Sequence, residues 1–510
     1  MNRTLKSSFL IAIALGAISL AAQTSAPPTN PSTSQRTKPS PQPTSHSQSA
    51  LERIQIPKLP DFHPQMPKRI VLDNGLVVFL QENHELPLIG GTMRFRGGSV
   101  LEPAEKTGML DVYGAVWRTG GTKSRTGDKL DDYLEARAAK LETGSSEDST
   151  TIGFNCLKQD FNDVFGAFKE LLFQPEFRED KITLIKLQME GGISRRNDDI
   201  DDIAGREAAK LAYGSDNPYT RIPEYATVEA ITRQDLLDWY QKYTHPNNAI
   251  IGIYGDFDSA QMEATIREAF AKWPQGQKAE DATIDFKPAK PGLYFIAKDD
   301  VDQSNIQMVG LGIERRNPDY FAVVVMNEIL GGGFSSRLFT TLRSKLGLAY
   351  SVGGGVGAGW DRQGMADFSI ATKSASTQDS IVNMKKELAT LLTSPPTAVE
   401  MKRAKDSILN SFVFNFDSKQ KVLAEQMRYE FYGYPADFLE RFRGGIEKVT
   451  VDDVNRVAKK YIHPDDLAIL VVGNTSEIGN QLTSLGSVSP IDITIPPPPG
   501  APAPPAGSSK

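Results

Sequence analysis

Cysteine and histidine are scarce in this chain of 510 residues, which has one cysteine and five histidines. The single cysteine, Cys156, excludes an intramolecular disulfide. It falls in the alternating segment IGFNCLKQD, a pattern that predicts a buried strand residue rather than a reactive thiol. No histidine has a second histidine three or four residues away. The chain therefore lacks the pair of histidines, one helical turn apart, with which a helix can bind zinc.

Clustered positive charge is also absent. The formal net charge is −6, and no run of Lys and Arg stands out along the chain. A surface that binds nucleic-acid phosphates needs such clusters, so the sequence argues against nucleic acid as a partner. The length and a hydrophobic content of 39% predict a soluble globular protein with more than one domain.

No apolar run is long enough to span a bilayer comfortably. The longest near the N-terminus covers residues 9–22; basic residues precede it, and small residues end it near Ala22. This pattern predicts a signal peptide at residues 1–22, with retention as a membrane anchor as the alternative. We therefore expect an exported chain, periplasmic or secreted, that is free of the membrane once the signal is cleaved.

Two segments have the composition of spacers. Residues 23–60 are rich in Pro, Ser, Thr and Gln, and they contain too little apolar surface to offset the entropy of ordering. They predict a flexible tether. Residues 491–510 predict a Pro-rich, extended tail. A docking role is the alternative for both segments.

An internal repeat lies between these segments. ITRQDLLDWYQKYTHP at residues 231–246 matches VTVDDVNRVAKKYIHP at residues 449–464, and its His245 lies 218 residues before His463. Gly75 and Gly292, each before a predicted strand, are 217 residues apart. The near-constant offset predicts two homologous halves, residues 61–288 and 289–490.

Each half repeats one order of predicted elements. Two alternating strands come first, then a helix, and an apolar strand closes the half. The strands are predicted at 76–80, 92–96 and 249–254, and at 293–296, 307–313 and 467–472; the helices are predicted at 107–117 and 318–330. This order predicts an α+β fold, with helices on one face of a largely antiparallel sheet in each half.

Residues 330–352, LGGGFSSRLFTTLRSKLGLAYSV, resemble the second-half signature of the pitrilysin/insulinase family of zinc peptidases, which includes the mitochondrial processing peptidase. The resemblance extends in the right order over about residues 65–480. It implies the two-half, LuxS/processing-peptidase-like fold of that family.

Active members of this family carry H-x-x-E-H on a helix of the first half, where two histidines bind zinc and the Glu polarises water. A further Glu ligand follows on a later helix. The resemblance places these four positions at Asp111, Gly114, Ala115 and Gly192. It therefore implies that this chain holds no metal and that zinc belongs to a partner chain.

The second-half pair of the family is retained as Arg343 and Tyr350. The resemblance implies that Arg343 binds substrate carbonyls and that Tyr350 donates to the oxyanion, with Gly347 turning the chain between them. The alternative is a surface arginine and a strand aromatic. No Lys-Ser/Thr follows Gly331, Gly332 and Gly333, which argues against phosphate binding and favours close approach of an extended peptide substrate.

Three functions follow from this pattern. The first is a non-catalytic subunit of a two-chain zinc metallopeptidase, paired with a zinc-bearing homologue or with a second copy of itself. The second is a structural or assembly scaffold of the same fold, and the third is an autonomous peptidase with a different apparatus. Retention of Arg343 and Tyr350 favours the first, because a scaffold needs no oxyanion donor.

Overall fold

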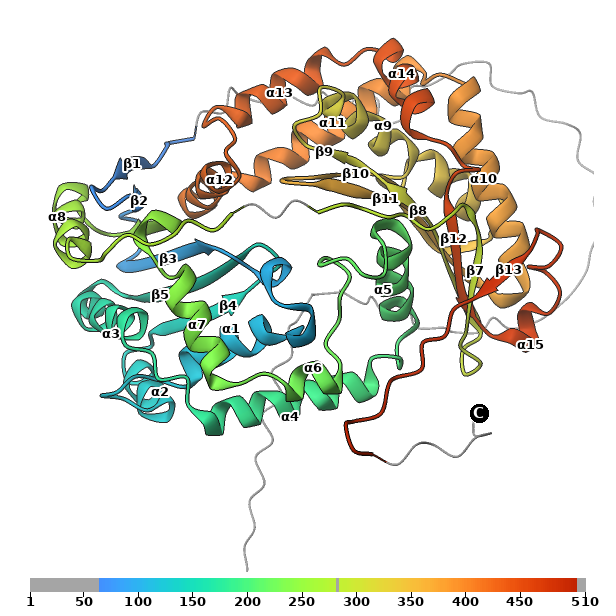
Figure 1. Cartoon of the computed structure of the whole chain (residues 1–510). Coiled ribbons are helices and arrows are strands. Elements are labelled where there is room, and N and C mark those ends of the chain that lie inside the picture. The colour runs from blue at the N-terminus through green and yellow to red at the C-terminus, as the bar shows by residue number, and fades with distance from the viewer. Residues whose placement is uncertain (1–63, 281–283, 502–510) are drawn as a thin grey trace, which may run out of the picture. The chain divides into compact units, whose positions relative to one another are not determined.

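Two β-sheets of matching strand order organise the part of the chain that the computed structural model describes, residues 64–280 and 284–501 (Figure 1). The predicted signal peptide, the predicted tether and the end of the tail lie outside these residues. Within the described part, no helix combines the length and hydropathy that crossing a membrane requires.

The first sheet has the order β1-β2-β6-β3-β5-β4. Only β2 and β6 run parallel within it. Its strands are β1 (Lys68–Val71), β2 (Val77–Glu82), β3 (Leu88–Arg96), β4 (Lys140–Ser145), β5 (Ser149–Leu157) and β6 (Ala249–Gly255). The helices of this half are α1 (Met109–Thr119), α2 (Gly127–Glu135), α3 (Phe161–Phe173), α4 (Glu179–Arg195), α5 (Ile200–Tyr213), α6 (Tyr225–Glu229), α7 (Arg233–Tyr243) and α8 (Ser259–Phe270).

The second sheet has the order β13-β7-β12-β8-β11-β10-β9. Its strands are β7 (Gly292–Ala297), β8 (Gln303–Leu311), β9 (Ile313–Glu314), β10 (Ala349–Gly359), β11 (Gln363–Lys373), β12 (Ala468–Gly473) and β13 (Val488–Pro490). The helices are α9 (Tyr320–Leu330), a π-helical turn (Phe339–Lys345), α10 (Thr377–Thr393), α11 (Ala398–Phe412), α12 (Lys419–Tyr432), α13 (Phe438–Lys448), α14 (Val451–Tyr461) and α15 (Thr475–Ile478).

The predicted α+β class is confirmed, and the order β7-β12-β8-β11-β10 repeats β2-β6-β3-β5-β4. A largely antiparallel sheet describes the first half better than the second. In the second sheet β13 and β7, β7 and β12, and β10 and β9 run parallel. The chain returns to β7 through long crossovers, which is the connection that parallel neighbours require.

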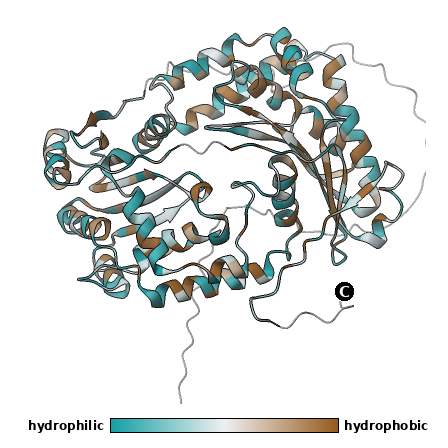
Figure 2. Ribbon diagram, viewed as in Figure 1, coloured by the Kyte–Doolittle hydropathy of each residue, from teal (hydrophilic) through white to brown (hydrophobic). Residues whose placement is uncertain are grey.

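Each sheet has its main core on one face. Helices α1, α3 and α7 cover that face of the first sheet, and α9, α10, α11, α13 and α14 cover the matching face of the second. In the second sheet β12 is apolar and buried throughout, whereas β8 and β11 mix apolar and hydrophilic residues, as the covering helices do (Figure 2). Cys156 is buried on β5, as predicted.

The opposite face of each sheet is covered by a helix from the other half (Figure 1). Helix α12 packs Leu423, Met427 and Phe431 against Phe79 and Ile250 of the first sheet. Helix α5 packs its apolar face against strands β8 and β12 of the second sheet. The expectation of helices on one face only was therefore wrong, because strands that are apolar on both faces need cover on both.

The described part of the tail also connects the two halves. Strand β13 pairs with β7, and the Ile491 N–H donates to the Phe295 carbonyl at 2.8 Å. The Asn197 amide of the first half donates to the Ile493 carbonyl at 2.7 Å. Ile491 and Ile493 pack beside α5, whereas residues 496–501 are exposed.

Candidate functional site

Helix α1, which carries three of the four zinc-motif positions, is anchored at its N-terminus by a buried carboxylate. Glu102, which is 6% exposed, accepts hydrogen bonds from the backbone N–H groups of Gly108 and Leu110 at 2.9 and 3.0 Å. These donors have no partner inside the helix, so the carboxylate acts as its cap. Burial raises the pKa of Glu102, while the two backbone hydrogen bonds oppose that rise. No sequence motif marks this cap, because Glu102 lies six residues before the N-cap residue Gly108.

The structure brings α1 and α4 into contact, as the family's metal site requires, but the motif positions carry almost no donor atoms. Asp111 lies in the first turn of α1 with access to solvent, and desolvation by its surroundings raises its pKa. Ala115 offers no ligand atom, and Gly192 on α4 faces open space. Asp111 alone does not make a zinc site, and within the described residues no three His, Cys, Asp or Glu side chains gather as metal ligands.

The surroundings of Gly114 leave no room for the glutamate that the zinc motif has at this position. A Cβ atom there would lie 2.8 Å from the Ser145 backbone nitrogen and 3.0 Å from the Gly144 carbonyl carbon. The Thr143 hydroxyl donates to the Gly114 carbonyl at 2.6 Å and holds β4 against the helix. The space that a longer side chain would need at this position is filled by backbone, so a water-polarising glutamate does not fit here.

The described histidines have local partners. In His84, Nδ1 lies 2.6 Å from an Asp256 carboxylate oxygen. The Nε2 atoms of His245 and His463 lie 2.7 and 3.0 Å from carbonyls in the last turns of α7 and α14. These two side chains close the ends of equivalent helices in the two halves, which accounts for their matching places in the repeat.

Arg343 and Tyr350 are presented to solvent in the second half. Arg343 lies in the π-helical turn, and Tyr350 lies at the start of β10 with half of its surface exposed. Gly347 between them has φ +65°, the left-handed conformation that turns the chain into the strand. Within the described residues, no hydrogen bond, ion pair or ring contact joins either side chain to α1 or α4. Both side chains are therefore open to solvent and do not contact the motif positions of the same chain.

The three glycines after α9 have different surroundings. Gly331 lies so close to the edge strand β10 that a Cβ would meet the Gly354 carbonyl oxygen at 2.3 Å. Gly332 packs against Glu328, and Gly333 has open space around it. Gly331 thus serves close packing within the chain, and peptide binding at Gly331, Gly332 and Gly333 stays a prediction.

Asn327 closes part of the same edge strand. Its side-chain amide donates to the Val356 carbonyl and accepts from the Val356 N–H, both at 2.9 Å. One side chain thus satisfies the backbone donor and acceptor that an added strand would use. Beyond Val356, strand β9 pairs with β10 at Ala358 and Gly359, so Asn327 and β9 together cover this end of β10.

The loop after the glycines is fixed by an ion pair. Arg337 forms a hydrogen-bonded salt bridge with Glu400 at 2.7 Å and donates to the Ser394 carbonyl at 2.9 Å. The hydrogen bond from Arg337 is the main reason that the pKa of Glu400 falls to about 2. Since Glu400 also completes the capping box of α11, the loop is tied to the start of that helix.

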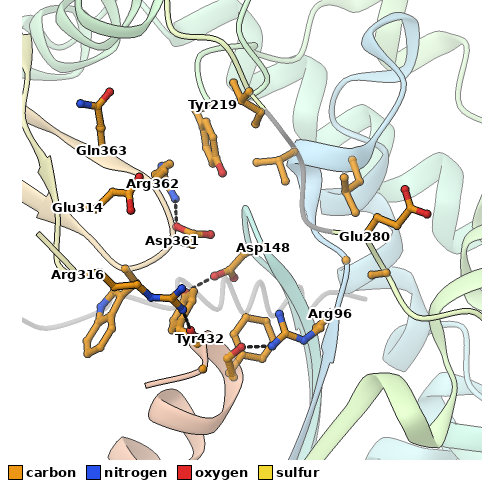
Figure 3. Close-up of a pocket in the computed structure, with 18 of the residues that line it drawn as sticks. Arg96, Asp148, Tyr219, Glu280, Glu314, Arg316, Asp361, Arg362, Gln363 and Tyr432 are labelled. Carbon is orange, nitrogen blue, oxygen red and sulfur yellow. Dashed lines mark hydrogen bonds and ion pairs between the residues drawn. The ribbon is translucent and has the colours of Figure 1, made fainter. Parts of the chain in front are cut away.

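A cavity of about 500 Å³ lies between the two halves and is lined by charged and aromatic side chains (Figure 3). Several charged groups in and beside it pair within the chain. Arg94 binds Asp148 at 2.9 Å, the Tyr432 hydroxyl donates to the same carboxylate, and Arg96 donates to the Phe431 carbonyl. Burial would raise the pKa of Asp148, but the positive charge of Arg94 and the hydrogen bond from Tyr432 lower it. The cavity therefore lies where the two halves contact each other. Its lining residues are far apart in the sequence, so no sequence motif could reveal it.

Comparison with known proteins identifies relatives of both halves. Residues 92–213 match the profile described as insulinase (peptidase family M16), and residues 230–408 match the profile described as the peptidase M16 inactive domain. A non-peptidase homologue, YmxG, from Helicobacter pylori is 25% identical, covering 78% of this chain and 91% of its own length. An uncharacterised zinc protease, YmxG, from Bacillus subtilis is 21% identical over 80% of this chain and 98% of its own.

Solved structures show the same architecture. A peptidase M16 inactive domain from Pseudomonas fluorescens superposes with a TM-score of 0.71 and 25% identity, covering 80% of this chain and 98% of that one. A protease from Helicobacter pylori superposes with a TM-score of 0.68 and 18% identity, over 80% of this chain and all of that one. The shared fold spans both sheets and their covering helices.

Proposed function

The chain belongs to the insulinase family, peptidase family M16, and we propose that it is a non-catalytic subunit of a two-chain zinc peptidase that cleaves peptides. One observation carries the proposal: the motif positions hold a single donor residue, Asp111, while Arg343 and Tyr350 remain and are exposed. The first half has lost the ligand residues, while the second half retains Arg343 and Tyr350. This pattern favours an active site to which two chains contribute.

In this proposal the partner is a homologous subunit that carries H-x-x-E-H and its zinc, and a second copy of this chain is the alternative partner. Arg343 donates hydrogen bonds to carbonyls of an extended peptide. The Tyr350 hydroxyl donates to the carbonyl oxygen as it gains negative charge in the tetrahedral intermediate. The signal peptide expected from the sequence would place the complex in the periplasm or outside the cell.

The names of the relatives support the absence of catalysis by this chain alone. The Helicobacter pylori relative is named a non-peptidase homologue, and the Pseudomonas fluorescens structure is described as an inactive domain. The Bacillus subtilis relative is named a zinc protease, so the relatives carry both kinds of name. The four motif positions of this sequence hold one donor residue, Asp111, which favours the absence of catalysis by this chain alone.

Zinc content and peptide cleavage test the proposal. We expect the purified chain to hold no stoichiometric zinc and to leave unfolded peptides intact, and a mixture with a homologue carrying H-x-x-E-H to cleave them. Tyr350→Phe removes one oxyanion donor and should lower kcat of the mixture by about 100-fold. Tyr225→Phe is the matched control, because the Tyr225 hydroxyl makes no hydrogen bond within the described residues and kcat should not change.

Two results would replace the proposal. Stoichiometric zinc together with cleavage by the chain alone would make it an autonomous peptidase. An active mixture that is indifferent to Tyr350→Phe would remove the oxyanion role and favour a scaffold.

A further inference from the structure

Two carboxylates are joined by two side-chain amides on the face of the second sheet that α5 covers (Figure 1). The buried Asn305 amide on β8 donates to the Asp201 carboxylate in the first turn of α5 at 2.6 Å. The buried Gln307 amide, two residues further along β8, donates to the side-chain oxygen of Asn305 at 3.1 Å. The other amide atom of Gln307 lies 2.6 Å from a carboxylate oxygen of Asp367 on β11. We call these four side chains the amide relay.

The relay cannot be satisfied by two ionised carboxylates. A carboxylate only accepts hydrogen bonds, whereas an amide has a donating nitrogen at one end and an accepting oxygen at the other. Asn305 donates to Asp201, so its oxygen faces Gln307. Gln307 donates to that oxygen, so its own oxygen faces Asp367 at 2.6 Å, a separation that requires a proton between them. Turning both amides round moves the conflict to Asp201 and does not remove it.

The surroundings of the two carboxylates place this proton on Asp367. Asp201 is exposed, so water stabilises its negative charge. Asp367 is partly buried, and desolvation raises the pKa of its carboxyl to about 6. A protonated Asp367 donates to the oxygen of Gln307, and every contact of the relay then joins one donor to one acceptor.

The other titratable groups on the elements around Asp367 do not bind it. They are Arg206, Glu207, Lys210 and Tyr213 of α5, Glu314 of β9, Glu328 of α9 and Tyr350 of β10, while β8 carries none. On α5, Arg206 and Lys210 both bind Glu207 at 2.9 Å. In the described part of the chain, Asp367 has no ion pair that would hold its carboxylate in the charged form.

Loss of the proton from Asp367 to water reverses the relay. Gln307 must then turn its nitrogen toward the ionised carboxylate, and its oxygen comes to face Asn305. Asn305 turns its own nitrogen toward that oxygen, so its oxygen comes to face Asp201. Two acceptors now meet at the first turn of α5, and the exposed Asp201 carboxylate moves into water.

We propose that the amide relay couples the protonation of Asp367 to the start of α5, which is tied to the second sheet while the proton is held and released when it is lost. The contact between the two halves is therefore firmer in mildly acidic solution than in neutral solution. The apolar face of α5 and the bond from Asn197 to the tail are unaffected, so the change is confined to the first turns of α5. This device belongs to the chain alone and does not depend on the two-chain function.

Hydrogen exchange of the α5 amides tests the relay in the full chain. It is measured by mass spectrometry between about pH 5 and pH 7.5 and corrected for intrinsic exchange rates. Protection of the first turns of α5 should fall by about tenfold as the pH rises through about 6, because a hydrogen bond to a charged group is lost.

Two substitutions should remove this dependence on pH. Asp367→Asn keeps a donor toward Gln307 at every pH, so protection of α5 should stay high. Asp201→Asn places an amide, which both donates and accepts, at the other end, so either orientation of the relay is satisfied. Asp302→Asn is the matched control: Asp302 is exposed just before β8, its side chain makes no hydrogen bond or ion pair within the described ranges, and the parent's pH dependence should remain.

The unfolding equilibrium gives a second readout. The pKa of Asp367 is higher in the folded chain than in the unfolded chain, so the folded state binds the extra proton and stability falls as the pH rises from about 4 to about 6. A shift of about two pH units changes the equilibrium constant by up to about 100-fold, and Asp367→Asn should abolish that change.

Each outcome decides the proposal. Protection of α5 that stays constant across pH 6 in the parent chain would overturn it. A pH dependence that Asp201→Asn leaves intact would also overturn it, because Asp367 would then act on α5 without the amides. A dependence that both relay variants remove and Asp302→Asn retains establishes the relay. If Asp367→Asn does not fold, Asp201→Asn decides alone, since that side chain is exposed.

Discussion

Gly114 and Gly192 both stand at positions of the lost metal motif, but their surroundings differ. Gly114→Ala should destabilise the protein, because its Cβ would lie 2.8 Å from the Ser145 nitrogen. The strain, about 1–3 kcal/mol, exceeds the gain in helix propensity of about 1 kcal/mol. Gly192→Ala meets no atom within 4 Å and should stabilise the protein by about 0.5–1 kcal/mol. Urea unfolding midpoints measure both, and an equal shift for the two variants would contradict the packing described for α1 and β4.

Asp319 should make the protein sensitive to acid. Burial would raise its pKa, but hydrogen bonds from Lys460, Tyr461 and Arg456 outweigh burial and lower the pKa to about 2. Because the folded-state pKa lies below that of the unfolded chain, the stabilisation is present above about pH 4 and is lost as the pH falls toward 2. Its size is on the order of 2 kcal/mol.

Asp319→Asn should therefore flatten the dependence of unfolding free energy on pH between about 4 and 2. Asp465→Asn is the control, because the Asp465 side chain in its ion pair with Lys385 is 92% exposed and screened by water. A slope unchanged by Asp319→Asn would mean that its partners do not act in the folded state.

Spacing along one helix or turn preserves register, so the sequence could predict where Asp111, Gly114, Ala115, Arg343 and Tyr350 lie in the fold. Their chemical roles stay predictions. Glu102 could not be found in the same way, because a capping carboxylate depends on the fold of the loop before α1.

Helix α12 contacts the first sheet through Met427 and Gly252, and substitutions of these two residues should not have additive effects on stability. Met427 lies where a Cβ on Gly252 would come within 2.2 Å of its sulfur atom. Gly252→Ala should cost about 1–3 kcal/mol by overpacking, and Met427→Ala about 2–4 kcal/mol by leaving a cavity. In the double variant the added methyl group partly fills that cavity. The two costs should therefore fall short of additivity by at least about 1 kcal/mol in a double-mutant cycle, and strict additivity would show that the contact is absent.

The elements show where sequence patterns stop being informative. Alternation and apolar runs predicted β2, β6, β7 and β12 close to their observed bounds, because side-chain period and burial are local properties. The runs AIIGIYG and AILVVG are apolar on both faces, which indicates cover on both sides. No local pattern says that the cover comes from a helix on the other half, since that depends on how the halves pack.

For the whole molecule, the exchange of α5 and α12 predicts that neither half folds well alone. Residues 61–288 expressed separately would leave the apolar face of α5 exposed, including Ile203 and Leu211, and one face of the first sheet uncovered. We expect each half alone to aggregate or to show poor near-ultraviolet dichroism. Co-expressed halves should elute together as one folded complex on size exclusion. A stable, monomeric first half would contradict this expectation.

The exchanged helices also bear on the history of the chain. A gene that has lost its zinc ligands is free to lose the domain that held them, unless that domain has a second use. Here the first half supplies α5, without which the half bearing Arg343 and Tyr350 would have an open hydrophobic sheet. Deleting the first half would therefore unfold the second. Mutual cover of this kind would preserve the first half whether or not selection still acts on its chemistry.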